Sequence, residues 1–259
     1  MYDVHAHILP GVDDGPKALD ESLRMAAVAA QHGTQVMLCT PHRKDVTENS
    51  SVEYIRDLVA ELNEKLRAMG VELELLLGME NHLDLDLPDE VMAGRALPIG
   101  NTRYILVEMP FTGRPIYLED KLYQLQSLGF TPILAHPERI ETFQRDPELL
   151  LNFVNRGMLS QITAGSTVGV FGRRVQQFTT NLLKRNLVHV VASDTHRPDG
   201  PRSPKLGPGI AAVTRLVGET SAMGMVIDTP RAILGNLPVE VDKPRSYDSV
   251  RRWWQFWSR

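Results

Sequence analysis

Short apolar stretches rich in Val, Ile and Leu alternate with longer amphipathic stretches along most of this chain. The apolar stretches are too short for typical helices and are bounded by turn residues, which is typical of buried strands. They predict seven strands, at residues 2–5, 35–40, 71–77, 104–107, 131–135, 158–162 and 187–192. Apolar residues at helical spacing predict helices at residues 19–32, 52–69, 116–128, 147–156, 174–185, 210–216 and 230–234.

The predicted helix at residues 52–69 shows the helical pattern most clearly. Gly70 follows it as a stop signal. Its apolar face is formed by Ile55, Leu58, Val59, Leu62 and Leu66. The segment 81–103 is less regular and contains Pro88 and Pro98, so it predicts only a short helix or a hairpin excursion.

The alternation of strands and helices predicts a single α/β domain with a parallel sheet covered by helices. A closed or nearly closed barrel is the form that this pattern favours. An open doubly wound sheet is the alternative, because periodicity alone does not distinguish the two.

Candidate metal chemistry begins in the first fifteen residues, MYDVHAHILPGVDDG. Residues two apart in a strand point to the same face, so His5 and His7 are placed to bind one ion from one side. An isolated pair of this kind is as easily explained by a strand-capping histidine followed by an ordinary turn. The other strand ends decide between these interpretations.

A histidine or a carboxylate follows six of the seven predicted strands. In a parallel barrel these strand ends meet at one rim, where active sites are built. With Asp14 added, the rim offers five imidazoles and four carboxylates, which is enough for two or three divalent ions. Nitrogen and oxygen ligands without thiolate suit manganese, iron or zinc. The candidate ligands are His5, His7, Asp14, His42, Glu80, Glu108, His136, Asp194 and His196.

Two arginines beside these residues are candidates for binding a phosphate, because the guanidinium fork suits phosphoryl oxygens. Arg139 follows His136 in the sequence HPER, and Arg202 lies in the loop after His196. The alternative for Arg139 is an ion pair with Glu138 or Glu141, and for Arg202 a plain loop position. Arg197 is a weaker candidate. Metal ions beside arginines predict hydrolysis of a phosphate ester.

Composition excludes several other classes of protein. The 259 residues carry a net charge of −4, which gives no electrostatic reason for binding nucleic acid. The one cysteine, Cys39, forms no internal disulfide, and Asp45 stands where a cysteine phosphatase needs an arginine. Asp84 and Asp86 are expected at the surface. The first strand begins close to Met1, without a secretory signal, and no apolar run would span a membrane, so we expect a cytoplasmic location.

Several motifs together resemble those of the polymerase-and-histidinol-phosphatase (PHP) superfamily. They are HAHILPGVDDGP, TPH, GME, LVEMP, AHPER and VHVVASDTHR, followed by DTPRAILGN. Within this superfamily, the chain is most similar to the bacterial metal-dependent protein-tyrosine phosphatases of capsule and exopolysaccharide loci. The resemblance covers the sequence from Tyr2 to about Leu237.

The resemblance implies a distorted TIM-like barrel of seven β/α units over residues 1–238 and a trinuclear centre, usually of manganese. It implies hydrolysis by a metal-activated hydroxide, with Arg139 and Arg202 on the substrate phosphate. The implied substrate is phosphotyrosine on a protein, typically a membrane-associated tyrosine autokinase that controls polysaccharide synthesis. The implied ligand sets are His5, His7, Glu80 and Asp194 for one ion, Glu80, Glu108 and His136 for the second, and Asp14, His42 and His196 for the third.

Two other functions remain open on the sequence: a small-molecule phosphoesterase acting on histidinol phosphate or a nucleotide, and a non-catalytic metal-binding scaffold. The tail at residues 239–259 contains all three tryptophans, with arginines beside them. Such a segment suits contact with a membrane surface or a partner, and docking onto this protein or a second copy is the alternative.

Overall fold

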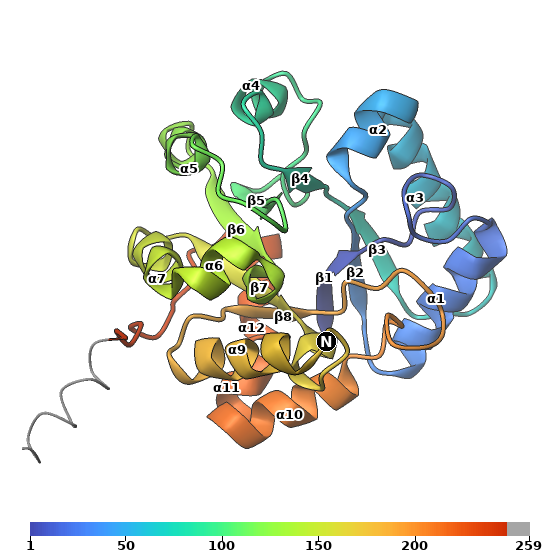
Figure 1. Ribbon diagram of the computed structural model, residues 1–259. Coiled ribbons are helices and arrows are strands. Elements are labelled where there is room, and N and C mark those ends of the chain that lie inside the picture. Colours follow the sequence, from blue (N-terminus) through green and yellow to red (C-terminus); the bar gives the residue numbers. More distant parts are fainter. Residues whose placement is uncertain (248–259) are drawn as a thin grey trace, which may run out of the picture.

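Parallel strands lie at the centre of the computed structural model, with helices around them (Figure 1). The structure describes residues 1–247. The strands in this part of the chain are β1 (Tyr2–Ala6), β2 (Val36–Cys39), β3 (Glu74–Leu77), β4 (Glu80–His82), β5 (Tyr104–Glu108), β6 (Thr131–Ala135), β7 (Leu159–Thr163) and β8 (Val190–Ala192).

Helices occupy most of the segments between the strands and after β8. The longer ones are α1 (Leu19–Gln31), α3 (Val52–Ala68), α5 (Leu118–Ser127), α7 (Pro147–Asn155), α9 (Arg173–Lys184) and α10 (Gly207–Val217). The shorter ones are α2 (Arg43–Asn49), α4 (Leu87–Met92), the 3-10 turn η1 (Pro137–Arg139), α6 (Glu141–Arg145), α8 (Ala164–Thr167), α11 (Glu219–Gly224) and α12 (Asp228–Leu234).

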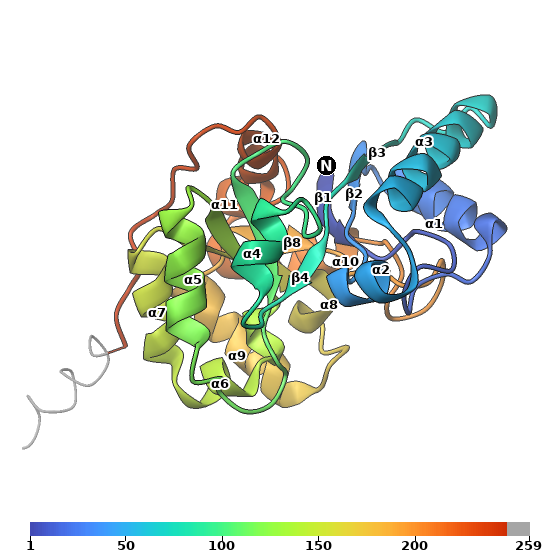
Figure 2. The same ribbon diagram turned by 90° about the horizontal axis from the view of Figure 1, so that it is seen from above.

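The strands form two sheets, in the orders β1-β2-β3 and β4-β5-β6-β7-β8, and every pairing is parallel. Isolated bridges join the two sheets at both junctions, Ala6 with Thr195 and His42 with Glu80. Figure 2, seen from above, shows α1 to α3 beside the first sheet and α4 to α7 beside the second. The predicted α/β fold with parallel strands is therefore confirmed, whereas the single closed barrel stays a prediction.

One hydrophobic cluster draws residues from both sheets and fills the space that the strands face in common. It contains Val4, Leu38, Leu106, Ile133, Leu159 and Val190, from β1, β2, β5, β6, β7 and β8. Neighbouring residues such as Ile105 and Leu134 belong instead to the cluster under the outer helices. This alternation follows the two-residue period of a strand, and it directs one face of each strand toward a shared interior.

The prediction for the helix at residues 52–69 is confirmed in detail. α3 ends one residue earlier, and its buried residues are the five that the sequence placed on the apolar face. Ser51 caps its first turn by accepting a hydrogen bond from the backbone N–H of Tyr54, at 3.1 Å. At the other end Gly70 has a φ of +70°, a left-handed conformation that favours glycine.

The sequence prediction was wrong about the number of strands and missed several short helices. Glu80 does not simply follow the third strand but begins an additional strand, β4, which is only three residues long. Helices α2, α6, α8 and α11 are each seven residues or shorter. Elements of this length contain too few positions for a periodic pattern to emerge.

No helix among residues 1–247 is long and apolar enough to cross a membrane. The segment after α12 runs back to the end of α9, where Arg185 donates a hydrogen bond to the backbone oxygen of Ser246 at 2.6 Å. The guanidinium of Arg185 also lies 3.9 Å from the ring centre of Tyr247. The predicted membrane contact of the tryptophan-rich tail falls on residues 248–259, outside the described residues.

Candidate metal centre

The structure gathers all nine predicted ligands at the C-terminal ends of the strands. His5 lies in β1, Glu80 begins β4, and Glu108 ends β5. The others lie in the segments that follow β1, β2, β6 and β8, and they are His7, Asp14, His42, His136, Asp194 and His196. We call these nine residues the rim cluster.

Glu80 lies at the centre of the rim cluster, and its side chain is 1% exposed. One of its carboxylate oxygens is 2.9 Å from Nε2 of His136 and 3.3 Å from Nε2 of His5. The other oxygen is 3.2 Å from Nε2 of His7 and 3.1 Å from Nδ1 of His42. A single carboxylate therefore connects four imidazoles that come from three different strand ends.

His5 and His7 turn the same ring atom toward this centre, and their Nε2 atoms lie 3.1 Å apart. The other nitrogen of each ring, Nδ1, makes a hydrogen bond on the side away from the cluster. Nδ1 of His5 donates to Oε1 of Gln161 at 2.7 Å, and Nδ1 of His7 donates to Oδ2 of Asp13 at 2.7 Å. When these rings are neutral, each Nε2 atom is the unprotonated nitrogen and directs its lone pair into the cluster, where a metal ion can take the place of a proton.

Gln161 and Asp13 are candidate supporting residues of the rim cluster that the sequence prediction missed. Gln161 lies in the middle of β7, the one strand whose end carries no histidine or carboxylate. A polar amide inside a strand that is buried throughout is a signal that points to a specific hydrogen-bond partner. Asp13 directly precedes the predicted ligand Asp14, and the histidine that it orients is only six residues away in the sequence.

The turn after β1 brings a second part of the rim cluster into place. Oδ1 of Asp14 lies 3.1 Å from Nε2 of His196 and 3.6 Å from Nε2 of His42. The turn approaches β1 so closely that a Cβ atom on Gly15 would lie 2.6 Å from the backbone oxygen of His7. Only glycine fits there, because any side chain would push Asp14 away from the two imidazoles.

Both candidate arginines meet at Asp194. Arg139 donates to Oδ2 of Asp194 at 2.6 Å, and Arg202 donates to Oδ1 at 2.8 Å. Asp194 and His136 have φ values of +50° and +32°, which are unusual for residues other than glycine. Such conformations cluster at functional sites, where the surrounding contacts maintain them.

The alternative ion pairs that the sequence allowed for Arg139 are absent from the described contacts. Glu138 is fully buried and accepts hydrogen bonds from the backbone N–H of Thr163 and the hydroxyl of Ser166, at 2.9 and 2.7 Å. Glu141 pairs with Arg145. Arg139 is thus free of both neighbours in sequence and directed to the rim cluster.

Charges inside the rim cluster shift the pKa values of its members in opposite directions. Burial acts to lower the pKa of the His7 imidazole, but Asp13 and Glu80 outweigh it and raise this pKa to about 10. Burial likewise opposes protonation of His42, yet Asp14 and Glu80 raise its pKa to about 11. The histidines around Glu80 overcome burial and hold the pKa of that carboxyl well below its ordinary value.

The arrangement of donor atoms fits divalent metal ions. Three groups of side chains each bring their ligand atoms within 4.8 Å of one another: His7, Asp14, His42 and His196; His5, His7 and Glu80; and His42, Glu80 and Glu108. The Nε2 atoms of His5 and His7 face each other at 3.1 Å, a distance that two lone pairs tolerate only with a proton or a metal ion between them. Imidazole and carboxylate ligands are those that manganese, iron and zinc accept.

The remaining histidines and the cysteine of the described chain lie mostly away from the rim cluster. His32 is exposed at the end of α1, and Cys39 is buried within β2. His82 is the exception and lies beside the rim cluster, because its Nδ1 is 3.8 Å from a carboxylate oxygen of Glu108. Asp84, which was expected at the surface, is partly buried and pairs with Arg43 at 2.5 Å.

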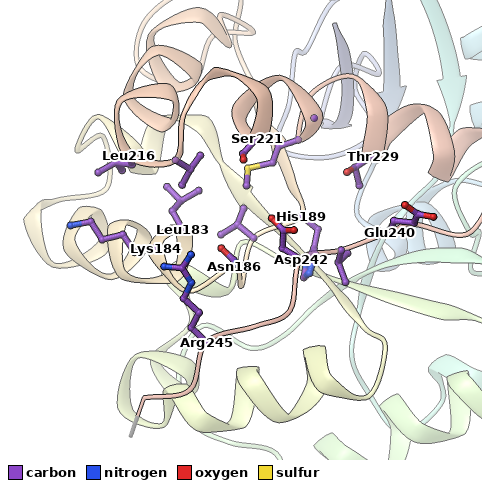
Figure 3. A pocket seen from close by; sticks show the side chains of 15 residues that line it. Leu183, Lys184, Asn186, His189, Leu216, Ser221, Thr229, Glu240, Asp242 and Arg245 are labelled. Atoms are coloured by element: carbon purple, nitrogen blue, oxygen red, sulfur yellow. The ribbon is translucent and has the colours of Figure 1, made fainter. Parts of the chain in front are cut away.

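A cavity of about 770 Å³ lies near the start of β8, away from the rim cluster (Figure 3). Its lining includes Leu183, Asn186, His189, Ser221 and Asp242, from α9, the approach to β8, α11 and the final described segment. Its lining carries two basic and two acidic side chains, Lys184, Arg245, Glu240 and Asp242. None of the nine predicted ligands lines this cavity, so it is distinct from the candidate metal centre.

A family model described as capsular polysaccharide synthesis, CpsB/CapC, matches residues 1–235. Tyrosine-protein phosphatase YwqE of Bacillus subtilis (strain 168) is 36% identical over 196 residues, which cover 76% of this chain and 77% of the relative. Tyrosine-protein phosphatase CpsB of Streptococcus pneumoniae is 27% identical over 239 residues, 90% of this chain and 98% of the relative.

Solved structures include one with a similar sequence and a similar fold. A structure described among those of YwqE from Bacillus subtilis and CpsB from Streptococcus pneumoniae, "unique metal-dependent tyrosine phosphatases", matches with a TM-score of 0.87 and 32% identity. The match covers 95% of this chain and 98% of that one. A β-aspartyl dipeptidase from Fervidobacterium islandicum AW-1 matches at a TM-score of 0.52 with 11% identity, a likeness of fold alone.

Proposed function

This chain belongs to the CpsB/CapC family of capsular polysaccharide synthesis proteins, and we propose that it hydrolyses phosphotyrosine in proteins with the help of divalent metal ions. The observation that carries the proposal is the rim cluster itself. Five imidazoles and four carboxylates meet there, beside two arginines that converge on Asp194. Relatives named as tyrosine-protein phosphatases support the choice of substrate.

We propose two or three bound ions, most simply manganese, with iron and zinc as the other ions that this donor set accepts. His5, His7, Glu80 and Asp194 would hold the first, Glu80, Glu108 and His136 the second, and Asp14, His42 and His196 the third. The distances add one alternative, because a ring nitrogen of His7 also lies within 4.8 Å of ligand atoms of Asp14, His42 and His196. Bound ions of this kind supply a water of near-neutral pKa and positive charge beside the phosphoryl oxygens.

Arg139 and Arg202 are the side chains that we propose to bind the substrate phosphate. Their guanidinium groups donate to opposite oxygens of Asp194, so both point to the same edge of the rim cluster. Arg202 is fixed there through its backbone oxygen, which accepts a hydrogen bond from the N–H of His196 at 3.0 Å. Two such forks bind phosphoryl oxygens with directed, charge-assisted hydrogen bonds, which stabilise the transferring phosphoryl group.

The leaving group favours a tyrosine ester over an alkyl ester. A phenol has a pKa of about 10, so its oxygen departs with less protonation than an alkoxide requires. No side chain of the rim cluster is assigned as a general acid. The proposal needs none for an aryl substrate.

The family description supports a role in capsular polysaccharide synthesis. We extend the proposal to a membrane-associated tyrosine autokinase as the protein substrate, with the phosphatase acting in the cytoplasm and at the membrane surface. Residues 1–238 would form the phosphatase domain, and residues 239–259 a basic, aromatic tail that contacts the membrane or the partner. A homo-oligomer is compatible with this arrangement.

The experiment that tests the proposed function compares three substrates under the same conditions. Full-length protein with added manganese is offered a phosphotyrosine peptide, histidinol phosphate and a nucleotide monophosphate, and phosphate release is measured over a range of substrate concentrations. We expect kcat/KM to be highest for the peptide. Equal or higher values for either small substrate would replace this proposal with a small-molecule phosphoesterase, and no release from any of them would favour a metal-binding scaffold.

A further inference from the structure

Two phenylalanines lie at the edge of the rim cluster, and metal binding does not account for them. Phe111 lies in the segment between β5 and α5, and Phe171 lies just before α9. The ring of Phe111 is stacked on the imidazole of His136, with 5.4 Å between ring centres and 9° between ring planes. Phe111 therefore touches a candidate metal ligand directly.

Arg139 lies against both of these rings. Its guanidinium carbon is 4.9 Å from the ring centre of Phe111 and 4.3 Å from that of Phe171. Cations at such distances from an aromatic face are attracted to it. The same guanidinium pairs with Asp194, so a phosphate bound at Arg139 would lie beside both rings.

The segment that carries Phe111 is fastened to the start of α6. The backbone N–H of Glu141 donates to the oxygen of Phe111 at 3.0 Å, and the hydroxyl of Thr142 donates to the oxygen of Gly113 at 2.7 Å. The N–H of Gly113 in turn donates to the carboxylate of Glu141 at 3.2 Å. The backbone that carries Phe111 is thus held in place before any ligand arrives, which reduces the entropy lost on binding.

Exposed apolar residues occur in both segments that bring a phenylalanine to Arg139, whereas the rim cluster is polar and mostly buried. Phe111 is 43% exposed, and Val168 and Val170, in the segment that leads to Phe171, are 43% and 37% exposed. Single exposed apolar residues are ordinary, but a group of them next to a polar site marks a surface that binds something. The ligand that fits has an anionic end and an apolar body joined directly to it.

We propose that Phe111 and Phe171 form an aromatic wall that receives the phenyl ring of the substrate, so that the site selects phosphate monoesters of phenols. The inference rests on the proposed phosphatase function and assigns the residues that select its substrate. In a phosphotyrosine side chain one oxygen separates the phosphorus from the ring, so a phosphate at Arg139 brings the ring to the wall. Ring contacts of this kind contribute about 2- to 10-fold in affinity.

Binding of two non-hydrolysable ligands tests the aromatic wall without relying on turnover. Benzylphosphonate carries the anionic group and the ring, whereas methylphosphonate carries the anionic group alone. Dissociation constants are measured by calorimetry for the manganese-loaded wild type and for Phe111→Ala and Phe171→Ala. We expect each variant to lose about 3- to 10-fold in affinity for benzylphosphonate and less than about twofold for methylphosphonate.

Ile116→Ala is the matched control, because Ile116 lies in the same segment as Phe111 and its side chain is fully exposed. It should bind both ligands as the wild type does. If both variants lost the same factor in affinity for benzylphosphonate and for methylphosphonate, the inference would be overturned. The two rings would then serve only to position Arg139. A wild type that binds both ligands equally would overturn it as well.

A third variant, Phe111→Leu, retains an apolar side chain and guards against a misfolded Phe111→Ala protein. It should still lose affinity for benzylphosphonate selectively. Turnover of a phosphotyrosine peptide by the wild type, measured in parallel, tests the proposed function separately from the aromatic wall. Absent turnover refutes the proposed function, whereas normal turnover with unselective variants refutes the aromatic wall alone.

Discussion

His7 at the rim cluster and His189 at the opposite end of the strands are both almost completely buried, yet their pKa values shift in opposite directions. Burial acts to lower the pKa of both imidazoles. Around His7 two carboxylates overcome burial and raise the pKa to about 10, whereas among residues 1–247 no carboxylate offsets the burial of His189 and its pKa falls to about 4. The difference shows that collected carboxylates, and not burial of a histidine, mark the functional end of this fold.

The largest effect is expected when a central residue of the rim cluster is removed. His136→Ala and Glu80→Ala should each reduce kcat/KM for a phosphotyrosine peptide by about 10³-fold or more, equivalent to about 4 kcal/mol of lost transition-state stabilisation. Both side chains project from strand ends into the rim cluster, so we expect the variants to fold. Circular dichroism and initial rates with added manganese provide the measurements.

His32→Ala serves as the control for these variants, because His32 is exposed at the end of α1. Its activity should match that of the wild type. Full turnover by purified, metal-loaded His136→Ala would show that the rim cluster is not the catalytic site.

A smaller effect is expected from Asp13, which touches the rim cluster only through hydrogen bonds. Asp13→Asn removes the charge behind Nδ1 of His7 but keeps an oxygen that can accept the hydrogen bond. Loss of such a supporting carboxylate typically weakens metal binding by about 10- to 100-fold. Competition against a chelator measures the affinity for manganese.

Asp86→Asn is the matched control for Asp13→Asn, because Asp86 is exposed at the start of α4. It should leave the metal affinity unchanged. An Asp13→Asn protein with the affinity of the wild type would mean that His7 is oriented by other contacts.

The rim cluster could be predicted from the sequence because parallel strands end at a common edge, so residues distant in the chain such as His42 and His136 come together. Gln161 was missed because it sits inside a strand and not at its end. β4 was missed because three residues show no period. Closure of the sheets into one barrel depends on pairings between β8 and β1 that no local pattern reveals, and the positions of Phe111 and Phe171 depend on loops without periodicity.

Substitution of His189 is expected to have the smallest effect on activity. It should instead change how the free energy of unfolding depends on pH. Its Nδ1 accepts a hydrogen bond from the backbone N–H of Ser160 at 2.9 Å, an interaction available only to the neutral ring. The ordinary pKa of the group is 6.5 and the folded value is about 4. The unfolded chain therefore takes up a proton first, so the stability that comes from neutral His189 is complete above pH 6.5 and is lost as the pH falls toward 4.

His189→Gln keeps an acceptor for Ser160 but does not titrate. The difference in unfolding free energy between wild type and variant should fall by about 2 kcal/mol between pH 7.5 and pH 5, as urea denaturation would measure. Titration of the rim cluster is common to both proteins and cancels in this difference, and phosphatase activity at pH 7.5 should be the same in both. A constant difference across this range would mean that His189 is protonated equally in both states, and the contrast with His7 would then no longer rest on charge.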